Sequence, residues 1–480
     1  MSVMEPRRIS ELIDLMQPAA VELVGDDALV GPEVVIDNRE ARPGAIFVAI
    51  PGERVDGHDF APRAVEAGAA CVIGTHLTEA DAPHILAADS VDALSWLARG
   101  VVAEARARGM LSVGVTGSSG KTSTKDLMAQ IFEAAGPTVA PVGSQNNEIG
   151  VPLTACRVGA STAYLISEMG ARGIGHIAWL TSLVGLDIGM CLNVGRAHVG
   201  EFGGMETTAR AKSEIVADLA PDGWAVLNFD DPLVSAMADA TRARIAWFGE
   251  GNLTGGDLRV TARDVRLNAL SQASFTLVAS DGDGERTAEV ALGVIGRQQV
   301  SNALAAAAAA LAAGLDLDLI AAALSAATPR SQWRMELAPR ADGVLILNDA
   351  YNANPDSMAV ALATAVELAA GTRREHPEAR VVAVLGDMLE LGPTAAELHQ
   401  ELGRLAADLG INEVVAVGEF ADQIVAGATS ENIAARASTR DQVASSLTLS
   451  PGDVVLIKGS RGVGLETVAA TLVARDGETK

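Results

Sequence analysis

A glycine-containing turn between a strand and a helix, at residues 115–123, constrains the fold of this 480-residue chain more than any other segment. The turn reads VTGSSGKTS, and the apolar run at residues 111–115 predicts a strand that leads into it. After the turn, Leu127 and Ile131 recur at helical spacing until a Gly-Pro pair ends the pattern. A strand, a tight turn and a helix in this order predict one unit of a parallel α/β sheet.

The same turn has the chemistry of a phosphate site. Glycines let backbone N–H groups face an anion, and the start of a helix adds the positive end of its dipole. Lys121 supplies a full charge, and the Thr122 hydroxyl is a ligand for Mg²⁺. The strict pattern has a glycine where this chain has Val115, which disfavours an ordinary P-loop switch protein but not phosphate binding. The alternative is a chance Gly-Lys-Thr at a strand–helix turn.

The chain divides into three blocks, in line with about 150 residues per domain. Residues 1–88 read as a small mixed α/β domain of short strands with one or two helices. Residues 89–328 contain the turn, further strands and an alanine-rich helix, and read as a P-loop-type α/β ATPase domain with a mostly parallel sheet. Residues 329–480 repeat strand then helix, as a Rossmann-like domain does. The predicted fold class is α/β with three domains.

Composition excludes several classes of function. With 36 basic and 61 acidic residues the net charge is −25, whereas nucleic-acid binding needs a dense basic face and an anionic membrane repels acidic proteins. The longest apolar run, residues 303–315, is mostly alanine and too short to span a bilayer. Three widely spaced cysteines indicate a reducing compartment, and the N-terminus does not read as a secretory signal. We therefore expect a cytoplasmic protein.

Polar side chains follow two further predicted strands of the central block. Glu168 ends an apolar strand, where a carboxylate near a bound nucleotide is a suitable Mg²⁺ ligand. His198 follows another strand, and Lys212 lies in a predicted helix. Taken singly, these are as well explained by a solvated carboxylate, a loop histidine and a surface lysine. Their order after the phosphate turn is what suggests a site.

Polar turns also follow the strands of the third block. NDAYNANP at residues 348–355 can hold a ribose hydroxyl or shape a substrate pocket, and Arg334 near the block boundary can reach a nucleotide phosphate. GDMLELG at residues 386–392 and the cationic KGSRG at residues 458–462 each leave a strand end. Each can be an ordinary βα loop, but carboxyl ends of parallel strands meet at one sheet edge.

These segments together resemble the Mur ligases, the ATP-dependent amide-bond ligases of peptidoglycan precursor synthesis. The resemblance covers nearly the whole chain, and its motifs come in the family's order. They are DNREARPGAIFVAIPGERVDGHDF, VTGSSGKTST, NNEIGVPLT, SEMGARGIGHI, NVGRAHVGEFGG, AKSEI, LNFDDP, QWRME, NDAYNANPDSM, VLGDMLELG with His399, and VLIKGSRG.

The resemblance implies a nucleotide and metal site. ATP would bind at Thr116, Gly117, Ser118, Ser119, Gly120, Lys121, Thr122, Ser123, Asn302, Arg334 and Asp349. Two Mg²⁺ ions are implied, with Thr122, Glu168 and His198 as ligands. Lys121, His198 and Lys212 are the implied catalytic residues, and Lys212 matches the lysine that carries CO₂ as a carbamate.

The resemblance also implies where the substrates bind. The first block would hold the uridine diphosphate end, with Asp37, Arg39, Asp56, Gly57 and His58 as candidates. Asn146, Asn147 and Glu148 would face the sugar–peptide, and Asn354, Lys458 and Arg461 the dipeptide. Four residues depart from the family pattern: Asn38, Gln298, Gln299 and Asn348.

The substrate-end motifs NNEIG, NANPDSM and GDMLELG resemble the dipeptide-adding branch of the family. The implied reaction joins D-Ala-D-Ala to UDP-N-acetylmuramoyl-tripeptide through an acyl phosphate, by a monomeric enzyme without nucleic-acid or membrane partners. Three alternatives stay open: a related ligase that forms the tripeptide or acts on folates, a P-loop phosphotransferase or switch ATPase, and an inactive binding module. Because ATP and dipeptide would bind to different blocks, we also expect the domains to close on each other.

Overall fold

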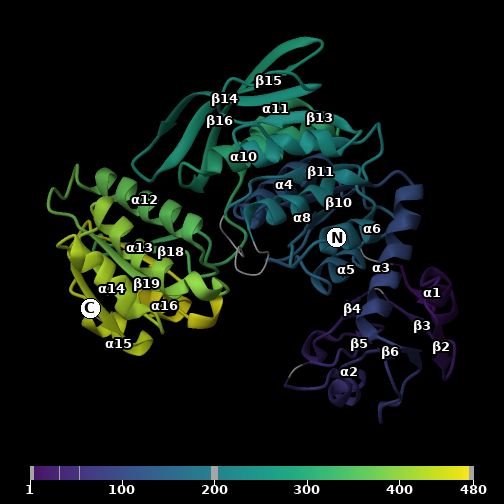
Figure 1. The fold of residues 1–480 in the computed structure, drawn as a ribbon. Helices are drawn as coiled ribbons and strands as arrows, with labels where there is room; N and C mark the ends of the chain where they lie inside the picture. The colour runs from purple at the N-terminus through teal and green to yellow at the C-terminus, as the bar shows by residue number, and fades with distance from the viewer. Residues whose placement is uncertain (1–4, 32, 53, 196–203, 475–480) are drawn as a thin grey trace.

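The computed structural model describes residues 5–31, 33–52, 54–195 and 204–474, and they form three α/β units around three main sheets (Figure 1). The predicted fold class, three α/β domains with a mostly parallel central sheet, is confirmed. Within the described ranges, no helix is both long and apolar enough to cross a membrane.

The N-terminal unit is a five-stranded mixed sheet. Its order is β2 (Val21–Val24), β7 (His84–Ala87), β6 (Cys71–Gly74), β5 (Ile46–Val48) and β4 (Val34–Val35). Only β2 runs antiparallel to its neighbour within this sheet. Helices α1 (Ile9–Leu15) and α2 (Ala61–Glu66) belong to the unit, and β1 (Arg7–Arg8) pairs with β3 (Leu29–Val30).

Helix α3 (Ser90–Ala107) joins the first unit to the second. Asp89 caps its N-terminus by accepting hydrogen bonds from the amides of Val91 and Asp92. The helix packs against α1 on one side and against α5 (Gly150–Ala155) and α6 (His176–Val184) of the central unit on the other. The two units therefore share one apolar core across this helix.

The central sheet has nine strands. Its order is β16 (Gly284–Ile295), β15 (Gln272–Asp281), β14 (Leu258–Leu267), β13 (Arg244–Phe248), β12 (Trp224–Asn228), β11 (Ile188–Cys191), β8 (Leu111–Thr116), β10 (Tyr164–Glu168) and β9 (Thr138–Val139). After β8, the chain forms β9 and β10 on one side of β8, and β11 later pairs with the other side of β8. Ligands of α/β sheets bind at such a reversal of strand order, and here the predicted phosphate turn follows β8.

Helices cover both faces of the central sheet. Side chains of β10 alternate between the two faces. Leu165 packs in the core formed with α3, α5, α6 and α8 (Met205–Ala217). The next residue, Ile166, packs in the core on the other face, formed with α4 (Lys121–Ala135), α10 (Gln299–Ala312) and α11 (Leu317–Ala326). Alanines 303 and 305–310 of α10 are fully buried, and their small side chains let α10 approach α4 and the strands. The short helix α9 (Pro232–Ser235) follows β12.

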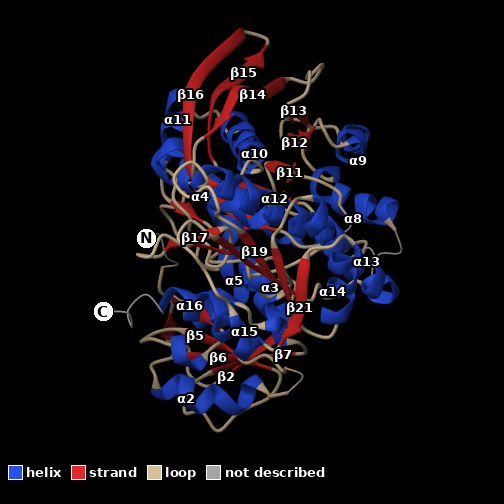
Figure 2. Cartoon of the chain, turned by 90° about the vertical axis from the view of Figure 1, so that its left-hand side faces the viewer, coloured by secondary structure: helices blue, strands red, loops and turns tan. Residues whose placement is uncertain are grey.

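Strands β14, β15 and β16 form the antiparallel end of the central sheet. They are long and project beyond the helices at the top of Figure 2. Ser271 at the β14–β15 turn donates a 2.6 Å hydrogen bond to Glu367 of α12 (Pro355–Thr372), which ties this extension to the C-terminal unit.

The C-terminal unit is a six-stranded sheet with helices on both faces. Its order is β17 (Glu336–Pro339), β18 (Leu345–Asn348), β22 (Val454–Lys458), β19 (Val381–Gly386), β20 (Glu413–Val417) and β21 (Ala434–Ser438), parallel except for β17. Helices α12, α13 (Ala395–Asp408) and α14 (Ala421–Ser430) pack on one face, and α15 (Arg440–Ser446) and α16 (Glu466–Ala474) on the other. This doubly covered sheet confirms the Rossmann-like prediction.

Phe132 offers a test of how α4 is held on the central sheet. Its ring is fully buried and meets the Tyr164 ring edge-on at 4.9 Å. Phe132→Ala should lower the free energy of unfolding by about 3–5 kcal/mol, because it leaves a cavity that the packed helix cannot fill. Urea unfolding followed by circular dichroism measures this loss. Val142→Ala, at a side chain that is 73% exposed, is the control. Equal midpoints for both variants would contradict this packing.

Candidate active site

A cavity of about 790 Å³ lies between the central and C-terminal units. The phosphate turn, α4, α10 and the end of β10 border it on one side, and the ends of β18 and β22 on the other. It is lined by many of the residues predicted from sequence: Ser118, Ser119, Gly120, Lys121, Thr122, Ser123, Asn146, Asn147, Glu168, Lys212, Asn302, Arg334, Asp349, Asn354 and Lys458. The two units thus build one site together.

The phosphate turn is held by hydrogen bonds to neighbouring strand ends. The Thr116 hydroxyl donates to the Met169 carbonyl at 2.8 Å. The amides of Ser118 and Ser119 donate to Asn193 Oδ1 at 3.0 and 2.9 Å, so they face this side chain and not the cavity. At these two residues the structure differs from the expectation that backbone N–H groups of the turn face a phosphate. The first turn of α4 supplies the remaining donors, because helix N-termini leave amides without intrahelical partners.

Gly120 enters α4 in a left-handed conformation, with φ of 79°. A Cβ there would lie 2.7 Å from Asn302 Oδ1. Glycine is therefore required both by the backbone and by the close approach of α10. Asn302 in turn accepts a 3.2 Å hydrogen bond from the Thr124 hydroxyl and donates to Gln299 Oε1 at 2.8 Å.

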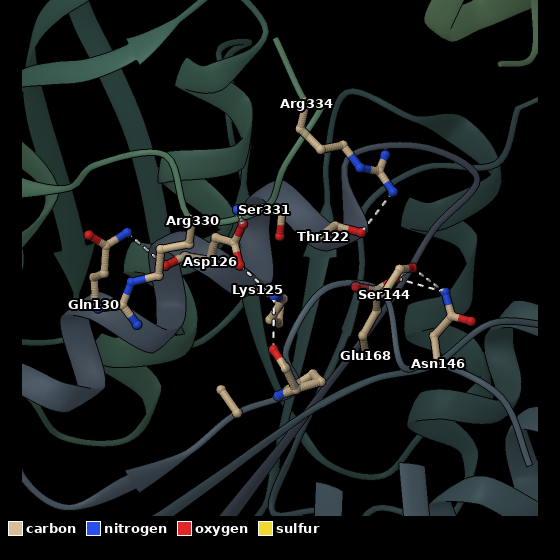
Figure 3. A network of polar contacts seen from close by, with 12 residues as sticks. Thr122, Lys125, Asp126, Gln130, Ser144, Asn146, Glu168, Arg330, Ser331 and Arg334 are labelled. Atoms are coloured by element: carbon tan, nitrogen blue, oxygen red, sulfur yellow. Dashed lines mark hydrogen bonds and ion pairs between the residues drawn. The ribbon is translucent and has the colours of Figure 1, made fainter. Parts of the chain in front are cut away.

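Lys121 and Thr122 begin α4 beside this turn. Lys121 Nζ donates to the Gly117 carbonyl at 2.7 Å, and burial lowers the pKa of Lys121. The Thr122 hydroxyl accepts a 3.1 Å hydrogen bond from Arg334 Nη2, as Figure 3 shows. Arg334 Nε is buried and has no hydrogen-bond partner among the described residues. A cation with an unused donor beside a phosphate turn is suited to a phosphate oxygen.

Glu168 ends β10 and is fully buried. Its Oε1 accepts hydrogen bonds from Ser144 Oγ and Asn146 Nδ2, both at 2.8 Å, so two neighbours orient the carboxylate (Figure 3). Its Oε2 is buried without a hydrogen-bond partner in the part of the chain that the structure describes. A buried, oriented carboxylate oxygen and the Thr122 hydroxyl fit Mg²⁺, which prefers oxygen ligands.

The described residues contain no group of three or more His, Cys, Asp and Glu side chains that could hold a metal ion. A Mg²⁺ bound at Thr122 or at Glu168 would take its other ligands largely from water and phosphate oxygens, as this ion commonly does with nucleotides. His198, predicted as a metal ligand and catalytic residue, lies outside the described residues.

Lys212 of α8 lines the same cavity and is 5% exposed. Burial, reinforced by the nearby charge of Lys121, lowers the pKa of Lys212 to about 7. A large share of this amine is therefore neutral at neutral pH, and a neutral amine is a nucleophile whereas an ammonium is not.

The linker between the units runs along α4 (Figure 3). Gln130 exchanges two hydrogen bonds with the backbone of Thr328, at 2.9 and 3.1 Å. Arg330 makes a two-pronged ion pair with Glu133 at 2.5 and 2.7 Å. The Ser331 amide donates to Asp126 Oδ2 at 3.1 Å, and Asp126 is also paired with buried Lys125. These contacts hold the linker against α4 between the end of α11 and Arg334, which lies at the phosphate turn.

Beyond this linker, a buried ion pair organises the C-terminal side. Lys458 Nζ donates to Asp349 Oδ2 at 2.5 Å and to the Asn352 carbonyl at 2.8 Å. Asp349 Oδ1 accepts from the Met335 amide at 3.1 Å. Burial lowers the pKa of Lys458, and Asp349 opposes this shift. Lys458, predicted to contact substrate, lines the cavity, but its ammonium is engaged by these groups of the chain itself.

A second cavity of about 170 Å³ lies at the same end of the C-terminal sheet. Residues 352–354, 389–391 and 460–462 line it. Predicted Asn354 borders it and caps α12 by accepting from the Ser357 amide at 2.8 Å. Predicted Arg461 also borders it, stacks on the Trp333 ring at 4.0 Å and pairs with Glu466 at 2.6 Å.

The residues predicted to hold the uridine end lie in the N-terminal unit and border neither of these two cavities. Asp37 accepts hydrogen bonds from the Arg39 guanidinium, which lowers the pKa of Asp37 to about 2. His58 is 4% exposed, with Nδ1 donating to Asp56 at 2.6 Å and Nε2 accepting from the Thr75 amide at 2.9 Å. The His58 ring thus holds two loops together, and a Cβ on adjacent Gly57 would lie 2.6 Å from the Ile50 backbone.

Two of the residues predicted to face the sugar–peptide make local contacts. Asn147 caps the turn before α5, and Glu148 pairs with Arg172 at 2.8 Å and approaches His176 at 3.5 Å.

Sequence reasoning missed several residues at the large cavity. Arg172 and His176 line the cavity although no role was predicted for them. Asn193, Ser144, Tyr351 and Glu390 were missed as well. Most lie inside segments that carried the family resemblance, so the signal was present at the level of the segment and not of the residue.

Models of the Mur ligase family match three parts of the chain: the catalytic domain at residues 33–102, the middle domain at 115–310 and the glutamate ligase domain at 333–461. The chain is 41% identical to the UDP-N-acetylmuramoyl-tripeptide–D-alanyl-D-alanine ligase of Mycobacterium tuberculosis over 98% of each chain. The chain belongs to the Mur ligase family. Solved structures agree: MurF from Acinetobacter baumannii aligns with a TM-score of 0.84 at 30% identity, covering 99% of this chain and 100% of that one.

A second solved Mur ligase, MurF from Thermotoga maritima, was crystallised in complex with ADP. It aligns with a TM-score of 0.74 at 27% identity, covering 93% of this chain and 98% of that one. The family resemblance seen in the sequence of this Mur ligase is therefore confirmed.

Asn146 tests whether Glu168 belongs to a metal site. Asn146→Ala removes one of the donors that orient Glu168 and should raise the Mg²⁺ concentration needed for ADP binding by about 10–100-fold. Calorimetric ADP titrations at several Mg²⁺ concentrations measure this. Asn252→Ala, at an exposed asparagine before β14, is the control. An unchanged Mg²⁺ requirement in Asn146→Ala would remove Glu168 from the metal site.

Proposed function

We propose that this Mur ligase joins D-Ala-D-Ala to the terminal carboxylate of UDP-N-acetylmuramoyl-tripeptide and converts ATP to ADP and phosphate. The observation that carries the proposal is the single cavity in which the phosphate turn, Glu168 and Lys212 meet the strand ends of the C-terminal unit. An ATP hydrolase needs only the phosphate turn and the groups beside it, and not the strand ends of the C-terminal unit. The tuberculosis relative, 41% identical over nearly its whole length, carries the name of this activity.

ATP binds with its phosphates at residues 116–123 in this proposal. Lys121 and Arg334 neutralise the phosphate oxygens. Arg334 Nε, which has no hydrogen-bond partner among the described residues, supplies an added hydrogen bond. Asn302 and Asp349 line the same cavity and would contact the adenosine and phosphates in this proposal. Thr122 would hold one Mg²⁺, and Glu168 and His198 would hold a second. When bound, Mg²⁺ supplies charge neutralisation for the phosphates.

The reaction begins with attack of the tripeptide carboxylate on the γ-phosphorus, which forms an acyl phosphate as the bond to ADP breaks. Several anions must approach one another in this step, so the chain's contribution is mainly cationic positioning. The amine of D-Ala-D-Ala then attacks the carbonyl carbon and phosphate leaves. The cavity lies between two units, which lets them exclude water from the acyl phosphate.

Lys212 carries CO₂ as a carbamate in this proposal. Its neutral amine attacks CO₂, a proton is released, and a cation becomes a carboxylate-like anion. The low pKa of about 7 supports this, because a fully protonated lysine cannot react. The carbamate would remove the electrostatic repulsion between the positive charges of Lys212 and Lys121, because it replaces one of these charges by an anion.

We further propose that residues 1–88 bind the uridine diphosphate end, residues 89–328 bind ATP, and residues 329–480 bind the dipeptide. Asp37, Arg39, Asp56, Gly57 and His58 serve the first site, with His58 as a positioning residue. Asn146, Asn147 and Glu148 face the sugar–peptide, and Asn354, Lys458 and Arg461 border the dipeptide. The enzyme acts as a cytoplasmic monomer on small molecules.

A ligation assay tests the proposal. UDP-N-acetylmuramoyl-tripeptide, D-Ala-D-Ala, ATP and Mg²⁺ should yield a nucleotide product heavier by one dipeptide less water, with one phosphate released per product. Dipeptide-independent ATP hydrolysis at the same rate, with no heavier product, would contradict it. Replacing the dipeptide by single amino acids separates this ligase from relatives with other acceptors.

Lys212→Ala should abolish ligation, and short carboxylates such as acetate should restore part of it by occupying the place of the carbamate. In the unmodified enzyme, activity after removal of CO₂ should fall and bicarbonate should restore it, more so above the Lys212 pKa of about 7 than below it, because only the neutral amine reacts. Steady-state phosphate release measures both. Full activity of Lys212→Ala would exclude the carbamate role.

A further inference from the structure

We propose that Tyr351 is a positioning residue for phosphate transfer, because its ring holds the Arg334 guanidinium at the place where the phosphates of ATP bind. This inference rests on the proposed ligase function and adds to it a residue that acts through another side chain. Both residues line the large cavity, Arg334 from the linker and Tyr351 from the turn after β18.

The guanidinium of Arg334 lies over the face of the Tyr351 ring. Its Cζ atom is 4.2 Å from the ring centroid, a separation at which the π-electrons attract a cation. Arg334 Nη2 donates to the Thr122 hydroxyl at 3.1 Å (Figure 3). Arg334 Nε is buried and has no hydrogen-bond partner among the described residues. The ring thus supports the guanidinium while this donor is left for a phosphate oxygen.

Hydrogen bonds on both sides of Arg334 hold its segment beside the turn that carries Tyr351. The antiparallel pairing of β17 with β18 ends just before these two segments. The Met335 amide donates to Asp349 Oδ1 at 3.1 Å, and the Tyr351 amide donates to the Trp333 carbonyl at 3.2 Å. The close approach of the guanidinium to the ring is therefore built into the backbone of the C-terminal unit.

The backbone on both sides of Arg334 is also strained. Trp333 has φ of 57° and Met335 has φ of 48°, in the left-handed region that residues with large side chains seldom adopt. Such strain persists only where the surroundings impose it, and it is concentrated at functional sites. The chain thus fixes the backbone of Arg334, and the Tyr351 ring fixes the far end of its side chain.

Arg334 needs an attractive partner because like charges lie near it. Burial lowers the pKa of Lys121 and of Lys458, and the positive charge of Arg334 contributes to both shifts. By the same interaction, the two lysines repel the guanidinium. The face of the Tyr351 ring supplies an attraction that opposes this repulsion before any phosphate is bound.

The kind of partner matters as well. A carboxylate would hold Arg334 but would also cancel its charge, as happens at Arg461, which stacks on the Trp333 ring and is paired with Glu466 at 2.6 Å. Within the described ranges, no carboxylate forms an ion pair with Arg334. An aromatic face attracts a guanidinium without neutralising it and leaves its N–H edge free. Tyr351 therefore holds Arg334 in place with its charge available to the phosphates of ATP.

Tyr351→Leu tests the role, and Tyr351→Phe is the variant that keeps the ring. Loss of the ring should lower kcat/KM for ATP by about 3–30-fold, the range that a cation–π contact supports. The dissociation constant of ADP in the presence of Mg²⁺ should rise by a similar factor. Tyr351→Phe should stay within about twofold of the unmodified enzyme, because the π-face is the part that acts. Ligation rates at varied ATP and calorimetric ADP titrations measure these effects.

Trp224→Leu is the matched control. It removes another stack of an arginine on an aromatic ring, that of Arg244 at 3.8 Å, and Trp224 borders neither cavity. Its kcat/KM for ATP and its affinity for ADP should equal those of the unmodified enzyme. If Tyr351→Leu has a lower thermal unfolding midpoint by circular dichroism, Tyr351→Met, which also lacks a ring, repeats the measurements.

A double-mutant cycle with Arg334→Ala shows whether Tyr351 acts through Arg334. Tyr351→Leu should weaken ADP binding in the unmodified chain and have little further effect in the Arg334→Ala chain. ADP titration needs no turnover, so the cycle can be completed with inactive variants. Equal losses in both chains would show that the ring acts on the ligand directly and would overturn the proposal. A loss in Tyr351→Phe as large as that in Tyr351→Leu would overturn it too.

The fate of this inference can be told apart from that of the proposed function. If the unmodified enzyme forms no ligated product from UDP-N-acetylmuramoyl-tripeptide, D-Ala-D-Ala and ATP, the ligase function fails whatever the variants do. If the unmodified enzyme ligates and Tyr351→Leu matches it in kcat/KM for ATP and in ADP binding, the ligase function stands and the role of Tyr351 is excluded.

Discussion

Helix α4 links the phosphate turn to the C-terminal unit, and the shape of the active site depends on that link. Its first turn presents Lys121 and Thr122, while its flank holds the linker through Asp126, Gln130 and Glu133. The linker then delivers Arg334 back to Thr122. A nucleotide bound at the start of α4 would therefore contact the same helix that holds the linker to the C-terminal unit. This gives a physical route by which phosphate binding and domain arrangement can be coupled.

The second constraint is electrostatic. The chain carries a net charge of −25, yet the large cavity is lined by Lys121, Lys212, Arg334 and Lys458. Burial lowers the pKa of each of these three lysines, which means that their charged forms lack part of the solvation they have in water. Polyanionic substrates restore that stabilisation, so their binding is favoured in a locally positive cleft against an acidic background. Lys458 is already paired with Asp349, whereas Arg334 Nε has no partner within the described residues.

The sequence predicted the fold well where local pattern and packing agree. The strand before the phosphate turn, α4 and the parallel C-terminal strands were all expected, and the turn glycine Gly120 has the left-handed backbone that only glycine adopts easily. The strands β13 and β21 were not expected, because short strands without strict alternation give a weak signal. At the site, sequence indicated which segments matter but not their partners. The hydrogen bonds from the Ser118 and Ser119 amides to Asn193 join two segments that are distant in the sequence, and no local pattern encodes such contacts.

In the proposed mechanism, one cavity couples phosphate transfer to amide formation through an acyl phosphate. Tripeptide nucleotide labelled with ¹⁸O in its terminal carboxylate tests this most directly. If the carboxylate attacks ATP, one labelled oxygen leaves with the phosphate, and mass spectrometry should find a single ¹⁸O in each phosphate released during ligation. Unlabelled phosphate, formed together with ligated product, would contradict the acyl phosphate and require a different route of activation.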